Sequence, residues 1–230
     1  MKTVDGWNRK AWMMLKEIHW YAFSIRWGSF LIGLWMMSLG IAMMIRANLG
    51  VAPWDVLHIG LSMVTPLTIG TWVQLVGFFF IALAAILDKK WPGPGALLNM
   101  LLIGFFVDLF LAMPWFVTPE QLWARWILMI VAIIIMGFGC GLYIAPQLGA
   151  GPRDGVVLAL SRRYGWSVGR VRLGMEVTVM GLGWLLGGPV FVGTLLFSVM
   201  IGPMMQFWIQ FWEKMIEQWL KRGVQIEGIH

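Results

Sequence analysis

Leu49-Gly50-Val51-Ala52-Pro53-Trp54-Asp55 returns as Leu148-Gly149-Ala150-Gly151-Pro152-Arg153-Asp154, at an offset of 99 residues. The same offset matches Gly40 with Gly139, and with one gap the correspondence continues to Gly95 and Gly193. A duplicated unit in a strongly apolar chain is the architecture of many secondary transporters, whose working site lies at the repeat interface. The duplication therefore indicates a class of membrane protein and leaves the substrate open.

The composition is that of a polytopic membrane protein. Hydrophobic residues make up 60% of the chain, charged residues 12%, and the mean hydropathy is +0.78, whereas a soluble domain carries about 25% charged residues. The 16 Trp suit interfacial belts, and the net charge of +6 favours cytoplasmic loops and anionic lipid over nucleic acid. Cys140 is the single cysteine, which excludes an internal disulfide and a cysteine metal cluster.

Six apolar segments have the length of membrane spans, since about 20 residues cross the roughly 30 Å hydrocarbon core. These predicted spans are 28–45, 69–87, 95–112, 122–144, 168–186 and 191–212. Residues 7–24 mix Trp and apolar side chains with basic ones, which predicts an interfacial amphipathic helix. We therefore divide the chain into an N-terminal region 1–27, a first membrane repeat 28–115, a second repeat 121–212 and a C-terminal tail 213–230.

Segments 53–64 and 152–163 are too short to be spans, because a dozen residues cover only about 18 Å as a helix. Each has Pro at its first helical position, a favourable helix start. If both are half-helices that enter and leave on one side, the basic residues of the N-terminus, of 89–90, of 162–163 and of the C-terminal tail all fall inside. The prediction is an all-α protein with two inverted repeats, each of three transmembrane helices plus one re-entrant half-helix, and with both termini cytoplasmic.

The repeated motif also resembles that of a known family. The run 48–62 followed by 68–71, together with the second-half run 148–155, is similar to the signatures of the YczE family of bacterial integral membrane proteins, which is related to the YyaS- and YitT-type proteins. The resemblance implies a multi-pass protein of the bacterial cytoplasmic (inner) membrane. The family has no agreed substrate, so the resemblance implies no catalytic residues.

Two aspartates occupy equivalent places, at the third position of each half-helix. In one interpretation Asp55 and Asp154 cap free backbone amides, where negative charge is favoured. In the other, the half-helices begin near the midplane, and the two carboxylates face each other and bind a proton, Na⁺ or a cationic group. His58 lies three residues after Asp55 and can share its face. Its repeat mate is Val157, so a role in proton transfer is confined to one half, and a packing role is the alternative.

Other charged residues lie within predicted spans. Glu176 is near the middle of 168–186, where a carboxylate is costly, so we expect either a structural ion pair with Arg172 one turn earlier or a substrate-binding carboxylate. Asp108 and its repeat mate Gln206 suggest an asymmetric polar lining, with snorkelling of Asp108 to the outer interface as the alternative.

Arg153 replaces Trp54 beside the second aspartate. With Arg170 and Arg172 it suggests an anion-selective vestibule, because guanidinium groups match carboxylate and phosphate; ordinary positive-inside bias is the alternative. The half-helix starts that would frame the site are Gly50, Pro53, Gly149 and Pro152.

These patterns predict a transporter-like protein that moves a small polar solute or ion through a midplane site. The alternative is a membrane accessory or scaffold protein for a biosynthetic or signalling partner, and a third reading is a small channel. Catalytic motifs such as His-Glu-x-x-His and Gly-x-Ser-x-Gly are lacking in the sequence, so we expect no enzyme, cofactor or bound metal. The expected partners are membrane lipid, the solute and possible further copies of the chain.

Overall fold

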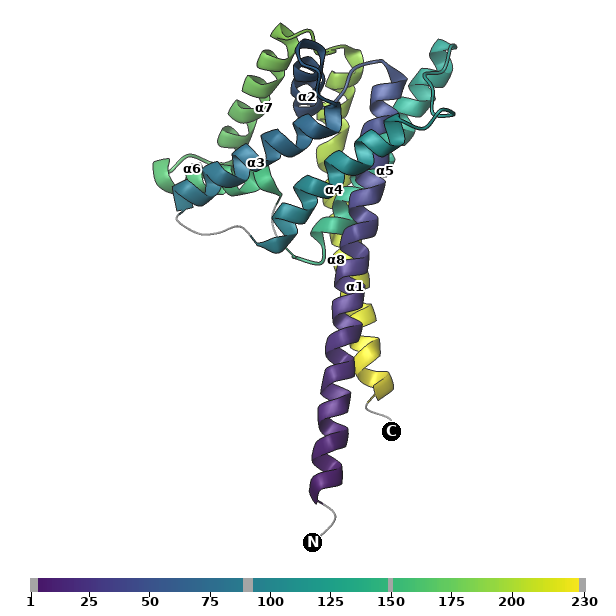
Figure 1. Cartoon of the computed structure of the whole chain (residues 1–230), viewed down its shortest axis with the longest axis vertical. Coiled ribbons are helices and arrows are strands. Elements are labelled where there is room, and N and C mark those ends of the chain that lie inside the picture. Colours follow the sequence, from purple (N-terminus) through teal and green to yellow (C-terminus); the bar gives the residue numbers. More distant parts are fainter. Residues whose placement is uncertain (1–3, 89–92, 149–150, 228–230) are drawn as a thin grey trace.

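The computed structural model describes residues 4–88, 93–148 and 151–227, and the regular structure within these ranges is α-helical. Side chains are described within 20–87, 93–148 and 151–221, without those of Pro152, Asp154 and Leu158. The helices are α1 (Val4–Ala47), α2 (Pro53–Val64), α3 (Ile69–Asp88), α4 (Pro94–Leu111), α5 (Leu122–Ile144), α6 (Pro152–Tyr164), α7 (Val168–Leu185) and α8 (Val192–Glu227) (Figure 1).

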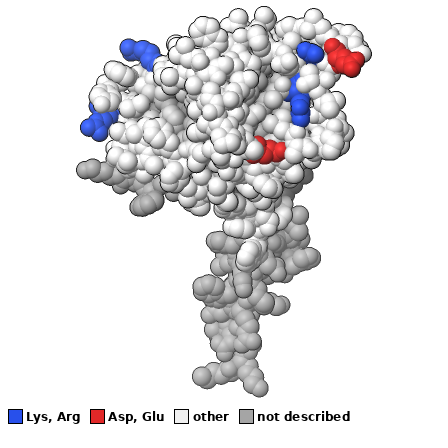
Figure 2. Space-filling view, turned by 45° about the horizontal axis from the view of Figure 1, so that its top comes forward, with Lys and Arg blue, Asp and Glu red and all other residues white. Residues whose placement is uncertain are grey.

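Five of the described helices, α1, α3, α4, α5 and α8, are long and apolar enough to cross a membrane. The prediction of an all-α membrane protein is therefore confirmed. Helix α7 matches the fifth predicted span, 168–186, but falls outside this set, because its 18 residues include Arg170, Arg172 and Glu176. The surface that Figure 2 shows is largely uncharged, as expected for a face in contact with lipid.

Helix α1 runs without a break through the predicted interfacial helix and the first span. It has 44 residues, or about 66 Å at 1.5 Å per residue, roughly twice the hydrocarbon thickness. The continuity has a local reason, since the chain offers only the isolated Gly28 and no Pro at the expected boundary. The start of α1 and the end of α8 lie at the same end of the molecule (Figure 1), and Tyr21 Oη donates a hydrogen bond of 3.4 Å to the carbonyl of Trp219.

The centre of the molecule is the antiparallel crossing of α1 and α5. Gly40 of α1 lies against Met136 of α5, and Gly139 of α5 lies against Met37 of α1. Under the 99-residue offset these are the same contact made twice. Small residues at both places let the two backbones approach closely where no hydrophobic force drives helices together.

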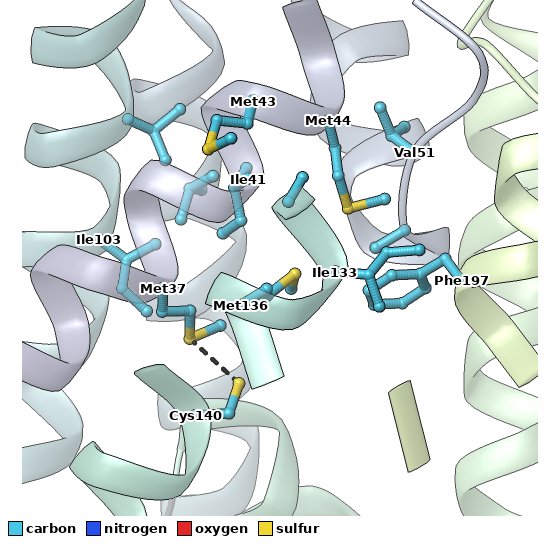
Figure 3. Packing of buried hydrophobic residues seen from close by; sticks show 14 of the residues in the cluster. Met37, Ile41, Met43, Met44, Val51, Ile103, Ile133, Met136, Cys140 and Phe197 are labelled. Carbon is cyan, nitrogen blue, oxygen red and sulfur yellow. Dashed lines mark hydrogen bonds between the residues drawn. The ribbon is translucent and has the colours of Figure 1, made fainter. Parts of the chain in front are cut away.

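The core around this crossing is rich in sulfur. Met37 and Met136 pack with Ile41 and Ile103 between α1, α4 and α5 (Figure 3). The thiol of Cys140 lies 3.6 Å from the sulfur of Met37, the contact dashed in Figure 3. Flexible thioethers fill the irregular gaps that glycine-mediated crossings leave.

The outer helices exchange partners between the two halves. Helix α2 packs against α7, and α3 packs against α6. A Cβ on Gly183 of α7 would meet the backbone of Val56 in α2, and a Cβ on Gly155 of α6 would meet the side chain of Ala84 in α3. These two contacts again correspond under the offset, so the half-helix of each repeat is held by the third helix of the other repeat.

Candidate functional site

The first half-helix begins where the backbone makes a sharp turn after α1. Asn48 and Gly50 have positive φ angles of 52° and 110°, conformations that glycine adopts at no steric cost and asparagine tolerates. The amide of Gly193 donates to the carbonyl of Leu49 at 2.7 Å, which ties this turn to the start of α8. Pro53 then occupies the first turn of α2, where its missing N–H costs nothing.

The second half-helix is built in the same way. Helix α6 follows Gly151, has Pro in its first turn, and ends at Gly165 with φ of 68°. Neither Ala52 before α2 nor Gly151 before α6 provides a side-chain cap. Neither N-cap side chain therefore satisfies the backbone N–H groups that a helix start leaves without an intrahelical partner.

The starts of the two half-helices meet. The guanidinium carbon of Arg153 lies 4.3 Å from the ring centroid of Trp54, over its face. Arg153 and Trp54 correspond under the 99-residue offset, so this cation–π contact joins equivalent positions of the two sequence repeats. A contact of this kind contributes about 0.5–2 kcal/mol, more when it is shielded from water.

A cavity of about 420 Å³ lies where the half-helices meet, and it is lined by residues of all eight helices. This volume is within the range of about 300–1,000 Å³ found for small-molecule sites. Six of the described lining side chains carry a carboxylate, guanidinium, imidazole or amide group, namely Asp55, His58, Asn99, Arg153, Arg172 and Glu176, and Tyr143 and Ser198 add hydroxyl groups. Five of these six were predicted from the sequence as site residues.

The shape of the cavity follows the repeat, while its chemistry does not. Equivalent residues line it from both halves: Met37 with Met136, Ile41 with Cys140, and Ile103 with Ile201. Three of the polar residues have a counterpart in the other repeat that also lines the cavity but has an apolar side chain or none. These pairs are His58 with Val157, Arg172 with Val73, and Glu176 with Gly77. The two halves therefore frame one site, and each contributes different polar groups to it.

Asp55 and His58 form a buried pair one turn apart in α2. His58 Nδ1 lies 3.4 Å from Asp55 Oδ1, and the two side chains are 1% and 4% exposed. The geometry does not make a hydrogen bond, so His58 Nδ1 has no hydrogen-bond partner among the described residues. A buried polar atom without a partner costs about 1–3 kcal/mol, which is a cost that a bound ligand can offset.

Asn99 of α4 has the same property and was not predicted. Its side chain is buried, with 5% of the residue exposed, and within the described part of the chain Nδ2 finds no acceptor. The residue lines the cavity. The sequence signal that could have identified it is an amide within an apolar stretch of this span, at a position where the other repeat has Phe197.

Arg172 and Glu176 make the ion pair that the sequence suggested. Arg172 Nε donates to Glu176 Oε1 at 3.1 Å, and the side chains are 55% and 34% exposed. An exposed pair at this spacing contributes about 0.3–0.5 kcal/mol. The pair is therefore of little value for stability, and its place on the cavity wall is the more informative fact.

Asp108 lies away from the cavity lining and caps a helix. Its Oδ1 accepts a hydrogen bond of 2.8 Å from the amide of Gly70, and its Oδ2 accepts one of 2.5 Å from Thr68 Oγ1. The carboxylate thus ties the end of α4 to the start of α3, and a negative charge is favoured at the start of a helix. Its repeat mate Gln206 is exposed and does not line the cavity.

The other predicted positions are placed as follows. Arg170 lines a second, mostly apolar hollow rather than the cavity. Gly149 and the side chains of Asp154 and Pro152 lie outside the described part of the structure.

A family model described as a family of unknown function, DUF6198, matches residues 24–210. The chain is 34% identical over 186 residues to "Uncharacterized membrane protein YczE" of Bacillus subtilis (strain 168), covering 80% of this chain and 85% of that protein. It is 36% identical over 183 residues to an "Uncharacterized protein" of Haemophilus influenzae, covering 78% and 81%. "Uncharacterized protein YyaS" of Bacillus subtilis is 28% identical over 179 residues, covering 76% and 87%. No solved structure gives a significant match.

Proposed function

This chain belongs to the DUF6198 family and is a YczE-like membrane protein, as its repeated motif indicated, and from its fold and cavity we propose that it is a transporter-like protein. It moves a small polar solute or ion through the cavity between α2 and α6. The observation that carries the proposal is that equivalent residues of both repeats line one cavity, with polar groups at the meeting point of two half-helices. Transporters built from repeats place their sites in this way.

In this proposal the two halves are inverted repeats. The contact of Gly40 with Met136, repeated as Gly139 with Met37 across an antiparallel crossing, supports that arrangement. Helix α7 completes three spans in the second half, and α2 and α6 are re-entrant. Their irregular ends are tolerated at membrane depth because they border a cavity. The positive-inside rule then places both termini in the cytoplasm of a bacterium, with the protein in the inner membrane.

The proposed mechanism is alternating access by relative movement of packed units. Helix α2 with α7, and α3 with α6, form two equivalent outer pairs, while α1 and α5 are locked at their glycine crossing. Rocking of the outer pairs against this centre would open the cavity first to one side and then to the other. No chemical conversion of the solute is involved in this role.

The test is uptake into proteoliposomes without a presumed substrate. Vesicles with purified protein are incubated with a defined mixture of amino acids, organic acids, amines, sugars and nucleosides, and retained solutes are measured by mass spectrometry. We expect at least one solute to accumulate, and accumulation to be lost when Asp55→Asn, Asp154→Asn and Glu176→Gln are combined. Glu120→Gln is the control, because Glu120 is exposed and does not line the cavity. Accumulation that survives the triple substitution would refute the proposed site.

A second candidate role is that of a membrane accessory protein. It is favoured by the length of α1 and α8, 44 and 36 residues, because about 30 Å of membrane needs only some 20 residues. The two helices contact each other over their extended parts, which offers a surface for a partner. Failure of every solute to accumulate, together with co-purification of one defined membrane partner, would favour this role.

A further inference from the structure

We propose that the cavity binds a small zwitterion, with its carboxylate beside Arg153 and the start of α6 and its ammonium group beside Asp55. The inference rests on the proposed function, since it names the class of solute for the same cavity. It comes from the presence of both positive and negative groups in the cavity lining, rather than from any single residue.

The described side chains that line the cavity include two cationic and two anionic ones, Arg153 and Arg172 against Asp55 and Glu176. Arg153 lies over Trp54, the residue next to Asp55. A lone cation held by Asp55 would therefore be repelled by a guanidinium close by, and a lone anion held by Arg153 would be repelled by the carboxylate. A solute that carries both charges meets an opposite charge at each end.

The available donors fit the anionic end. Helices α2 and α6 both begin at the cavity without a side-chain cap, and the positive end of a helix dipole favours a carboxylate. Asn99 also lines the cavity, and its Nδ2 is buried and has no acceptor among the described residues. A carboxylate in the cavity would provide the acceptor that this amide lacks.

The cationic end has a matching set of acceptors. Asp55 offers carboxylate oxygens in a site that is almost completely shielded from solvent. His58 Nδ1 lies beside it without a hydrogen-bond partner in the described structure, and a neutral imidazole nitrogen accepts from an ammonium group. The residue equivalent to His58 in the other half is Val157, which lines the cavity without polar side-chain atoms, so the imidazole is offered by one half only.

The test is a thermal-shift series on the purified full chain in detergent. The probes are the twenty standard amino acids and 4-aminobutanoate, each measured beside the acid that lacks its amino group and the amine that lacks its carboxylate. We expect at least one zwitterion to stabilise the protein, and its acid and amine partners to bind at least 10-fold more weakly. If an acid or an amine binds as well as its zwitterion, or if no zwitterion of the set binds, the inference is wrong.

Variants then locate the binding. Arg153→Gln and Asp55→Asn should each weaken binding at least 10-fold, and Arg153→Lys should restore part of it because the charge is kept. Arg163→Gln on the same helix as Arg153, and Glu120→Gln, are matched controls, since both residues are exposed and do not line the cavity. Equal losses in the controls would contradict the assignment.

The two proposals can fail separately. A zwitterion that binds with this dependence but does not accumulate in proteoliposomes would leave the binding site in place and overturn transport. A solute with a single charge, or with none, that accumulates in a manner sensitive to Asp55 and Glu176 would support transport and overturn the zwitterion.

Discussion

Replacement of Gly40 by alanine tests the packing on which the proposed repeat interface depends. A Cβ added at Gly40 would lie 2.8 Å from the Cβ of Met136 and 2.9 Å from the carbonyl oxygen of Ala132. Both distances are well inside van der Waals contact, so α1 and α5 must separate. Overpacking of this kind costs about 1–3 kcal/mol.

Alanine also stabilises a helix by about 1 kcal/mol relative to glycine. A control with the same Gly→Ala change is needed to separate this gain in helix propensity from the cost of the overpacking. Gly28→Ala on the same helix is the control, because no heavy atom lies within 4 Å of the added Cβ. We expect Gly40→Ala to be less stable than Gly28→Ala by about 2 kcal/mol, which for a chain of this size is a difference in melting temperature of about 4–8 °C.

Thermal unfolding in detergent, followed by tryptophan fluorescence, measures the difference. Gly139→Ala should cost a similar amount, since Gly139 makes the equivalent contact with Met37. Equal melting temperatures for Gly40→Ala and Gly28→Ala would refute the close crossing. A loss at Gly40 with none at Gly139 would refute the repetition of the contact.

Three further predictions concern single side chains. Asp108→Ala should lower the free energy of unfolding by about 0.5–2 kcal/mol, because the Gly70 amide loses its acceptor at 2.8 Å. The control Gln210→Ala, at an exposed position, should leave the melting temperature unchanged. A melting temperature that is also unchanged in Asp108→Ala would argue against the cap. Arg46→Met should cost about 1–3 kcal/mol in a denaturation measurement, because it removes the 2.6 Å hydrogen bond from the Arg46 guanidinium to a carbonyl at the end of α4. Cys140, the single cysteine and 4% exposed, should react with N-ethylmaleimide at least 10-fold more slowly in the folded than in the denatured protein, as measured by mass spectrometry; prompt labelling of the folded protein would contradict its burial.

The bounds of the two short helices α2 and α6 could be predicted from local sequence alone. The predicted segment 53–64 is α2 as the structure has it, and 152–163 differs from α6 by one residue at its end. Proline in the first turn and a break after a dozen residues are local signals, and they act before any other helix is in contact. The continuity of α1 does not follow from the same signals, because a change from polar to apolar side chains predicts a boundary between two segments, whereas no Pro or turn sequence ends the helix there.

The role of Asp108 was open in the sequence for a different reason. Its partners Thr68 and Gly70 lie about 40 residues away on another helix, so the cap exists only after α3 and α4 have packed. Asn99 is similar, because an amide on a helix is unremarkable until its surroundings are known to be a cavity.

The sequence by itself determined the helices, the duplication and the membrane class of this protein, because helix formation depends on neighbours four residues apart and membrane insertion on the apolar length of a segment. Only the tertiary structure decided which helices meet. The contact of Arg153 with Trp54 joins residues 99 positions apart, and the cavity beside it takes lining residues from every helix. Such contacts depend on the complementary shapes of distant surfaces, above all on glycines that let α1 cross α5, and no local pattern encodes them.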